Sequence, residues 1–175
     1  MLLFTAADPK TGQDLWVVPV EGERKPAPFL VTPFSETQGQ FSPGPAGSPR
    51  FVAYLSNESG QNEIYVQPFP AGGGKFQVSS GGGVQPRWRR DAKELFYIAP
   101  NGTLMAVEVK TAPRFEAGVP KALFQSRIWG AGLTNFVFRY DVSADGQRFL
   151  INTQPEQTAA APITVVVNWT AGLRK

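Results

Sequence analysis

The chain has 175 residues, no histidine, no cysteine and a formal net charge of +3, and 42% of its residues are hydrophobic. The missing residue types exclude a Ser-His-Asp or Cys-His nucleophile, a zinc site built from histidine or cysteine, and any disulfide. Eighteen glycines and 16 prolines in a chain of this hydrophobicity predict many short strands separated by tight turns.

One pattern of residues occurs about three times along the chain. Each copy has a polar turn, a hydrophobic strand, a short loop and another strand, and the copies begin near Phe41, Trp88 and Val142. The spacing of roughly 40–55 residues is close to the length of a four-stranded propeller blade. Helical periodicity is essentially absent, so we expect an all-β chain with no helix longer than a single turn.

The predicted strands are distributed unevenly between the units. The first unit begins at residues 2–4, which align with the second strand of later units, so its innermost strand is missing. The last unit ends with residues 163–167 and lacks a fourth strand. The fourth strands of the other units are predicted at residues 29–32, 76–79 and 122–125. The predicted blades are 2–36 (incomplete), 38–80, 84–126 and 137–170 (incomplete), within a single partial domain spanning 1–175.

The turns support this division into units. Asp145-Gly146 is a two-residue turn signal, because glycine accepts a positive φ angle there. Ala92 occupies the same place in the preceding unit, where alanine is a poorer choice if φ is positive. The unit at 38–80 instead carries a longer loop over Pro43–Pro49 that we expect to project from the surface, and its role is open.

These units resemble the PD40, or WD40-like, repeats of TolB-type β-propellers, in which a Trp/Phe-Ser-Pro-Asp-Gly turn precedes Ile/Val-Ala-Tyr and Ile-Tyr-Val. Residues 56–60 and 64–70 further resemble the C-terminal propeller of bacterial eukaryotic-type serine/threonine kinases, and residues 167–175 resemble the end of such chains. The resemblance implies a propeller fragment of about three to four four-stranded antiparallel blades.

The resemblance implies a non-catalytic binding or scaffold module that forms the C-terminal sensor or interaction part of a larger bacterial serine/threonine kinase. The chain has no Asp-Phe-Gly and no His-Arg-Asp sequence, so no kinase catalytic set is present in it. A fragment of a TolB-like envelope protein, or of the propeller of a prolyl-oligopeptidase-type hydrolase, remains an alternative. We expect no catalytic residue, cofactor or metal ligand in this chain.

Arg87, Arg89 and Arg90, which flank Trp88, are the candidate partner-binding residues. Three guanidinium groups beside an indole could hold phosphate or a carboxylate-rich partner. The alternative, which we favour, is that Trp88 belongs to the blade core and the arginines are edge and turn charges paired with Asp91 and Glu94. Packing is also the better interpretation of Trp16, whereas Trp129 is ambiguous. The carboxylate pairs Glu58/Glu63 and Asp141/Asp145 are expected to be solvated loop charges.

The partner is expected to be a protein, a peptide or a small ligand of unknown identity. Nucleic acid is not expected, because the basic residues are dispersed apart from the three arginines. No apolar run reaches the ~20 residues of a membrane helix. The location is open, and would be periplasmic or extracytoplasmic in a membrane-anchored kinase or a TolB-like protein. We expect upstream sequence or self-association to supply the missing blades, and whether Met1 is the native start is open.

Overall fold

The computed structural model describes residues 1–128 and 137–153. Within these ranges the chain consists of antiparallel strands, and the helical element is a single 3₁₀ turn, η1 (Pro45–Gly47). The predicted all-β fold is confirmed. None of the described helical segments has the length and apolar character needed to cross a membrane. The expectations for Trp129, for the strand at 163–167 and for the chain end at 167–175 lie outside the described residues.

The first two sheets follow the chain without a crossover. The first has the order β1-β2-β3, and its strands are β1 (Leu2–Asp8), β2 (Gly12–Val18) and β3 (Ala27–Leu30). The second has the order β4-β5-β6-β7, and its strands are β4 (Glu36–Phe41), β5 (Phe51–Ser56), β6 (Glu63–Pro68) and β7 (Phe76–Gln77). The outer strand predicted at 29–32 is therefore present two residues earlier as β3, and the one predicted at 76–79 is present in shorter form as β7.

The third sheet has a divided outer edge. Its strands are β8 (Val84–Trp88), β9 (Glu94–Ile98), β10 (Thr103–Lys110), β11 (Glu116–Ala117) and β12 (Lys121–Gln125). The long strand β10 pairs through its first half with β12, the predicted fourth strand, and through its last two residues with β11. The fourth sheet contains β13 (Tyr140–Val142) and β14 (Phe149–Ile151) among the described residues.

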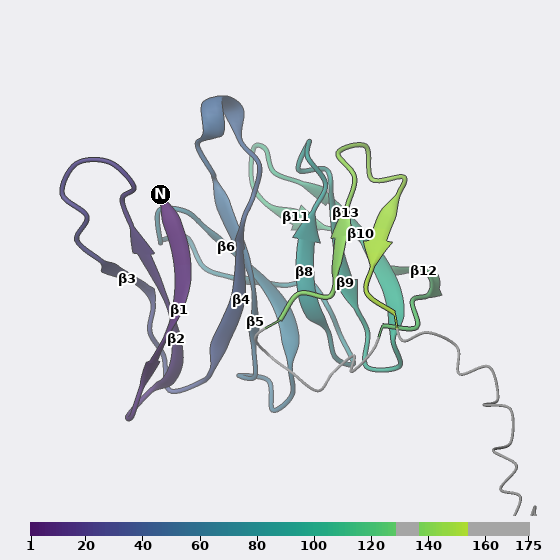
Figure 1. Ribbon diagram of the computed structural model, residues 1–175, viewed down its shortest axis with the longest axis horizontal. Coiled ribbons are helices and arrows are strands. Elements are labelled where there is room, and N and C mark those ends of the chain that lie inside the picture. The colour runs from purple at the N-terminus through teal and green to yellow at the C-terminus, as the bar shows by residue number, and fades with distance from the viewer. Residues whose placement is uncertain (129–136, 154–175) are drawn as a thin grey trace, which may run out of the picture.

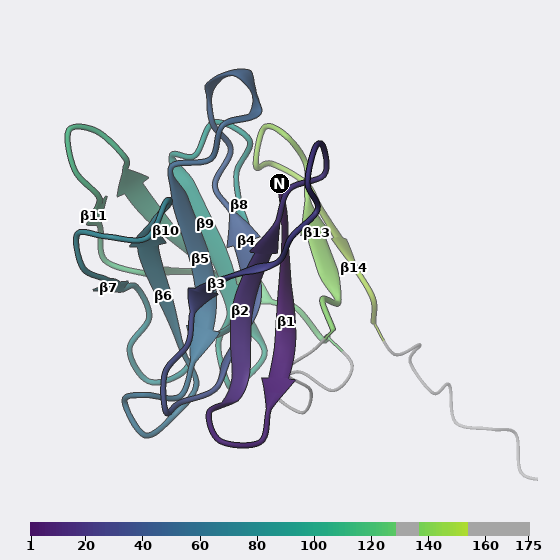
Figure 2. The same ribbon diagram turned by 90° about the vertical axis from the view of Figure 1, so that its left-hand side faces the viewer.

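The sheets follow one another across the molecule from the N-terminus, and their faces pack together as blades of a propeller do (Figure 1). Turned by 90°, the molecule has β1 and β13 toward one side and the outer strands β7 and β11 toward the other (Figure 2). Apolar side chains fill the space between the sheets. Leu15, Val52 and Tyr54 pack between the first two, and a larger cluster that includes Trp88 joins the others. Trp88 is 8% exposed, so it belongs to the core.

Strand pairing shows that β1 corresponds to β5 and not to β4. Phe4 pairs with Trp16 as Tyr54 pairs with Tyr65. In the second sheet, the inner strand β4 comes before β5, the equivalent of β1. In the described part of the chain the first sheet has no such strand.

The inner strands β4 and β8 are joined by a repeated hydrogen bond between neighbouring sheets. Gln38 and Gln85 have positive φ angles of 55° and 59° where the register of each strand shifts. The Gln38 side-chain carbonyl accepts the backbone N–H of Gln85 at 2.7 Å, and that of Gln85 accepts the N–H of Arg139 at 2.7 Å. We call this series the glutamine ladder. A left-handed backbone at a non-glycine residue costs about 1–3 kcal/mol, so the surrounding contacts must hold it in place.

Two loop predictions can be compared with the structure. Ala92 has a φ angle of 55°, so alanine does occupy a left-handed position where the last unit has glycine. The Pro43–Pro49 loop contains η1 and projects beyond β4 and β5 (Figure 1). Its base is closed by Ser42, whose hydroxyl accepts the N–H of Phe51 at 3.1 Å.

Candidate functional site

The three candidate arginines lie in different surroundings. Arg87 extends along the inner strands, where it donates to the side-chain oxygen of Gln40 at 3.2 Å and to the backbone oxygen of Tyr140 at 3.3 Å. Its guanidinium carbon lies 4.0 Å from the centre of the Phe138 ring, and its Nε lies 3.8 Å from Asp141. The expectation that Arg87 is an edge or turn charge paired with Asp91 and Glu94 is therefore wrong, because the strand directs it toward the neighbouring sheets.

Arg89 has the partners expected from the sequence. It forms a bidentate ion pair with Asp91, in which Nε lies 2.7 Å from one carboxylate oxygen and Nη2 lies 2.9 Å from the other. Its Nη1 lies 2.5 Å from Glu94. The hydrogen bond from Arg89 lowers the pKa of Asp91 below its ordinary value, with help from the backbone N–H of Lys93. Arg90 is exposed and lines a shallow hollow beside Pro43 and Gly44.

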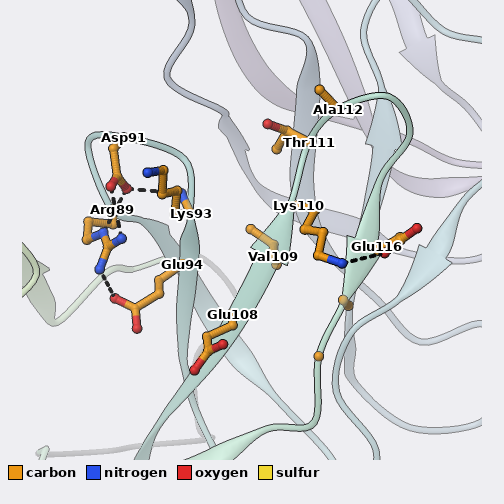
Figure 3. A pocket seen from close by; sticks show the side chains of 12 residues that line it. Arg89, Asp91, Lys93, Glu94, Glu108, Val109, Lys110, Thr111, Ala112 and Glu116 are labelled. Atoms are coloured by element: carbon orange, nitrogen blue, oxygen red, sulfur yellow. Dashed lines mark hydrogen bonds and ion pairs between the residues drawn. The ribbon is translucent and has the colours of Figure 1, made fainter.

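An open groove of about 760 Å³ lies next to Arg89 (Figure 3). We call it the charged groove. It is lined by Arg89, Asp91, Lys93, Glu94, Glu108, Val109, Lys110, Thr111, Ala112, Glu116, Ala117 and Gly118. The turn between β8 and β9 forms one wall, and β10 with β11 forms the other (Figure 3).

The ionised side chains of the charged groove are largely held in pairs. Lys110 lies 3.2 Å from Glu116, and Lys121 lies 2.6 Å from Glu108. These lysines lower the pKa of both carboxyls, because each donates a hydrogen bond to the ionised form. Both signs of charge therefore line the same hollow. Such a lining suits a ligand that itself carries both signs and disfavours a polyanion.

A metal centre is not formed within residues 1–128 and 137–153. No group of three or more acidic, histidine or cysteine side chains gathers there in a way that could hold an ion. The site chemistry within those ranges is that of ion pairs and hydrogen bonds.

Glu63 corrects one sequence expectation. It was expected to be a solvated loop charge, but it is 1% exposed. Its carboxylate accepts hydrogen bonds from the Ser79 hydroxyl, from the Gln61 side chain at 2.7 Å and from the backbone N–H of Gly82 at 2.8 Å. Because β6 begins at Glu63, the strand directs the carboxylate into the crossing to the third sheet, where it fixes the loop before β8.

Two further buried carboxylates lie where the first two sheets meet, and the sequence analysis did not single them out. Asp14 and Glu36 are each 1% exposed. Asp14 accepts from the Thr11 hydroxyl at 2.6 Å, and Glu36 accepts from Thr32 at 2.7 Å and Ser56 at 3.2 Å. The other oxygen of each carboxylate is buried without a hydrogen-bond partner. Asp14 is at the repeat position of Glu63, which is the signal that could have found it.

Burial raises the pKa of Glu36 above its ordinary value of 4.5. The hydrogen bonds from Thr32 and Ser56 act in the opposite direction, and the nearby charges of Asp14 and Glu58 raise the pKa further. Ionised Glu36 therefore reduces the stability of the fold.

Comparison with solved structures finds a protein of similar fold. The chain is similar to the crystal structure of TolB from Acinetobacter baumannii, with a TM-score of 0.49 and 17% sequence identity. The match covers 89% of this chain and 47% of that one, so this chain spans about half the length of the protein it matches. No family model matches the sequence, and no curated protein matches it.

Glu36→Gln is expected to stabilise the protein by about 1 kcal/mol at pH 8, because it removes an ionised, incompletely bonded carboxylate from the interior. A raised pKa in the folded state means that the wild-type protein loses stability as pH rises above the ordinary carboxyl value. The gain should therefore shrink below pH 4.5, where Glu36 is protonated in both states. Urea unfolding at several pH values measures this, with the exposed Glu23→Gln as control, and a variant less stable than wild type at pH 8 contradicts it.

Proposed function

We propose that this chain is a non-catalytic recognition module of the propeller type that binds a peptide or small ligand in the charged groove. The observation that carries the proposal is the groove itself, a hollow of about 760 Å³ whose walls carry ion pairs such as Arg89–Glu94 and Lys110–Glu116. Ligand sites in proteins have volumes of about 300–1,000 Å³ and a few fixed polar groups.

The character of the ligand follows from the lining. The charged groove contains the bases Arg89, Lys93 and Lys110 and a set of carboxylates: Asp91, Glu94, Glu108 and Glu116. A peptide with both acidic and basic side chains could exchange partners with these pairs without leaving a charge unpaired. Nucleic acid is a poor candidate, because its phosphates would meet the carboxylates.

We further propose that the module belongs to a larger bacterial serine/threonine kinase, as its C-terminal sensor or interaction part. The support is the resemblance of residues 56–60 and 64–70 to such propellers. A TolB-like envelope protein and a prolyl-oligopeptidase-type hydrolase are the alternatives. The neighbouring coding sequence distinguishes these three alternatives. A kinase domain with a membrane helix indicates the kinase, a signal peptide indicates the TolB-like protein, and a downstream Gly-x-Ser-x-Gly turn indicates the hydrolase.

Peptide display tests the binding proposal. A random heptapeptide library displayed on phage is expected to yield binders that carry both charge signs. Their affinity should fall at least tenfold for Lys93→Glu, which reverses the charge of an exposed lysine in the charged groove. The matched control is Lys25→Glu, an equally exposed lysine in the loop between β2 and β3, which should bind as wild type does. No enrichment, or equal loss in both variants, contradicts the proposal.

The absence of catalysis is tested separately. The purified chain incubated with magnesium, ATP and a general protein substrate is expected to transfer no phosphate and to hydrolyse no ATP above the buffer background. The physical reason is that the chain contains no histidine and no metal-binding Asp-Phe-Gly. Phosphate transfer that disappears after a point substitution in the charged groove would overturn this expectation.

A further inference from the structure

A second hollow beside Arg90, of about 350 Å³, lies between the Pro43–Pro49 loop and the turn that joins β8 to β9. We call it the loop hollow. Pro43 and Pro45 line it from the loop, and Arg90 and Ala92 line it from the turn. Ligand sites in proteins have volumes of about 300–1,000 Å³, so a hollow of this size suits one or two residues of a peptide.

The loop that forms this wall is closed at its base by hydrogen bonds. The Ser42 hydroxyl accepts the backbone N–H of Arg50 at 3.3 Å and that of Phe51 at 3.1 Å. Glycine is needed at position 44, because a Cβ there would collide with the Ser48 carbonyl oxygen across the loop. The backbone of Arg50 is therefore tied to the wall of the loop hollow.

Two arginines line the loop hollow, Arg50 from the end of the loop and Arg90 from the turn. Both are exposed. The guanidinium carbon of Arg50 lies 5.9 Å from the centre of the Phe51 ring, which is buried. Within residues 1–128 and 137–153 neither arginine takes part in an ion pair. Two such guanidinium groups at one hollow favour a ligand that carries negative charge.

The remaining lining indicates which anionic group fits. Asp91 also lines the loop hollow, and its carboxylate accepts from Arg89 at 2.7 and 2.9 Å and from the N–H of Lys93 at 3.0 Å. These partners leave Arg90 available, but the charge of Asp91 still opposes a phosphate dianion more than a carboxylate. Proline rings and the Phe51 ring give the hollow apolar surface, which suits the methylene groups of a glutamate side chain.

We propose that the loop hollow binds an acidic segment of a peptide, in which a glutamate carboxylate pairs with Arg50 and Arg90. The site is distinct from the charged groove, because neither arginine lines that groove and its lysines do not line the loop hollow. The two hollows adjoin at Asp91 and Thr111, which line both (Figure 3). Binding of an acidic segment here does not require a ligand in the charged groove.

The probe is a synthetic peptide, GEEG, acetylated and amidated at its ends so that its charges are those of the glutamates. Added to the full ¹⁵N-labelled chain at low salt, it should shift the amide resonances of Gly44, Phe51 and Ala92 saturably, since these residues line the loop hollow. The peptide GQQG has nearly the same shape without the charge, and it should leave the same resonances in place.

Variants of the protein locate the contact. Arg50→Gln and Arg90→Gln should each weaken the binding of GEEG by about fivefold or more, the loss expected for one charged hydrogen bond. The matched control is Arg24→Gln in the loop between β2 and β3, which removes an equally exposed arginine and should bind as wild type does. Lys93→Gln, in the charged groove, should also bind as wild type does, which separates this site from the proposed function.

Resonances remote from the loop hollow check that each variant is folded; if an arginine variant is not, the comparison of the two peptides decides alone. The proposal is overturned if GEEG causes no saturable shift, if both peptides shift the same resonances equally, or if only Lys93→Gln loses binding. A GSG peptide phosphorylated on its serine is the last arm. Tighter binding of that peptide than of GEEG would contradict the choice of a carboxylate.

Discussion

The sheets of this protein are held in order by side chains, because the hydrogen bonds of a β-sheet act only within that sheet. Gln38 and Gln85 supply polar contacts from one inner strand to the next, each accepting an N–H at 2.7 Å. Each glutamine has a left-handed backbone and lies at a shift in strand register, and from there its side-chain carbonyl accepts the N–H on the next inner strand. Apolar packing between the faces is stronger in total but has no direction, so the glutamine ladder is what fixes how one sheet lies against the next.

The same constraint divides the arginine-rich segment after β8. Once Gln85 is fixed at the bulge, Arg87 lies along the inner strands, where Gln40 and the Tyr140 carbonyl accept its hydrogen bonds. Arg89 follows the strand and turns to Asp91 and Glu94 at the charged groove. One arginine therefore joins three sheets and another orders a candidate binding surface. Their closeness in the sequence does not make them one site.

The sequence predicted the all-β fold and most of the strands, because alternating apolar residues and turn residues act locally and recur in each copy. It also predicted that Trp88 is packed and that Arg89 pairs with Asp91 and Glu94, since those partners are close along the chain. It missed contacts between residues far apart in sequence, such as that of Arg87 with Tyr140. Glu63 was misjudged for the same reason, because Ser79 and Gly82, which bury and satisfy it, belong to a later segment.

Amide hydrogen exchange tests most directly whether the glutamine ladder fixes the sheets. In the wild-type protein the N–H groups of Gln85 and Arg139 are expected to exchange as slowly as that of Ile98 in the core. In Gln38→Ala the N–H of Gln85 should lose its protection from exchange. The N–H of Arg139, which donates to the Gln85 side chain, should keep most of its protection. The account is contradicted if both amides in the wild-type protein exchange as fast as those of the exposed Gly60 turn.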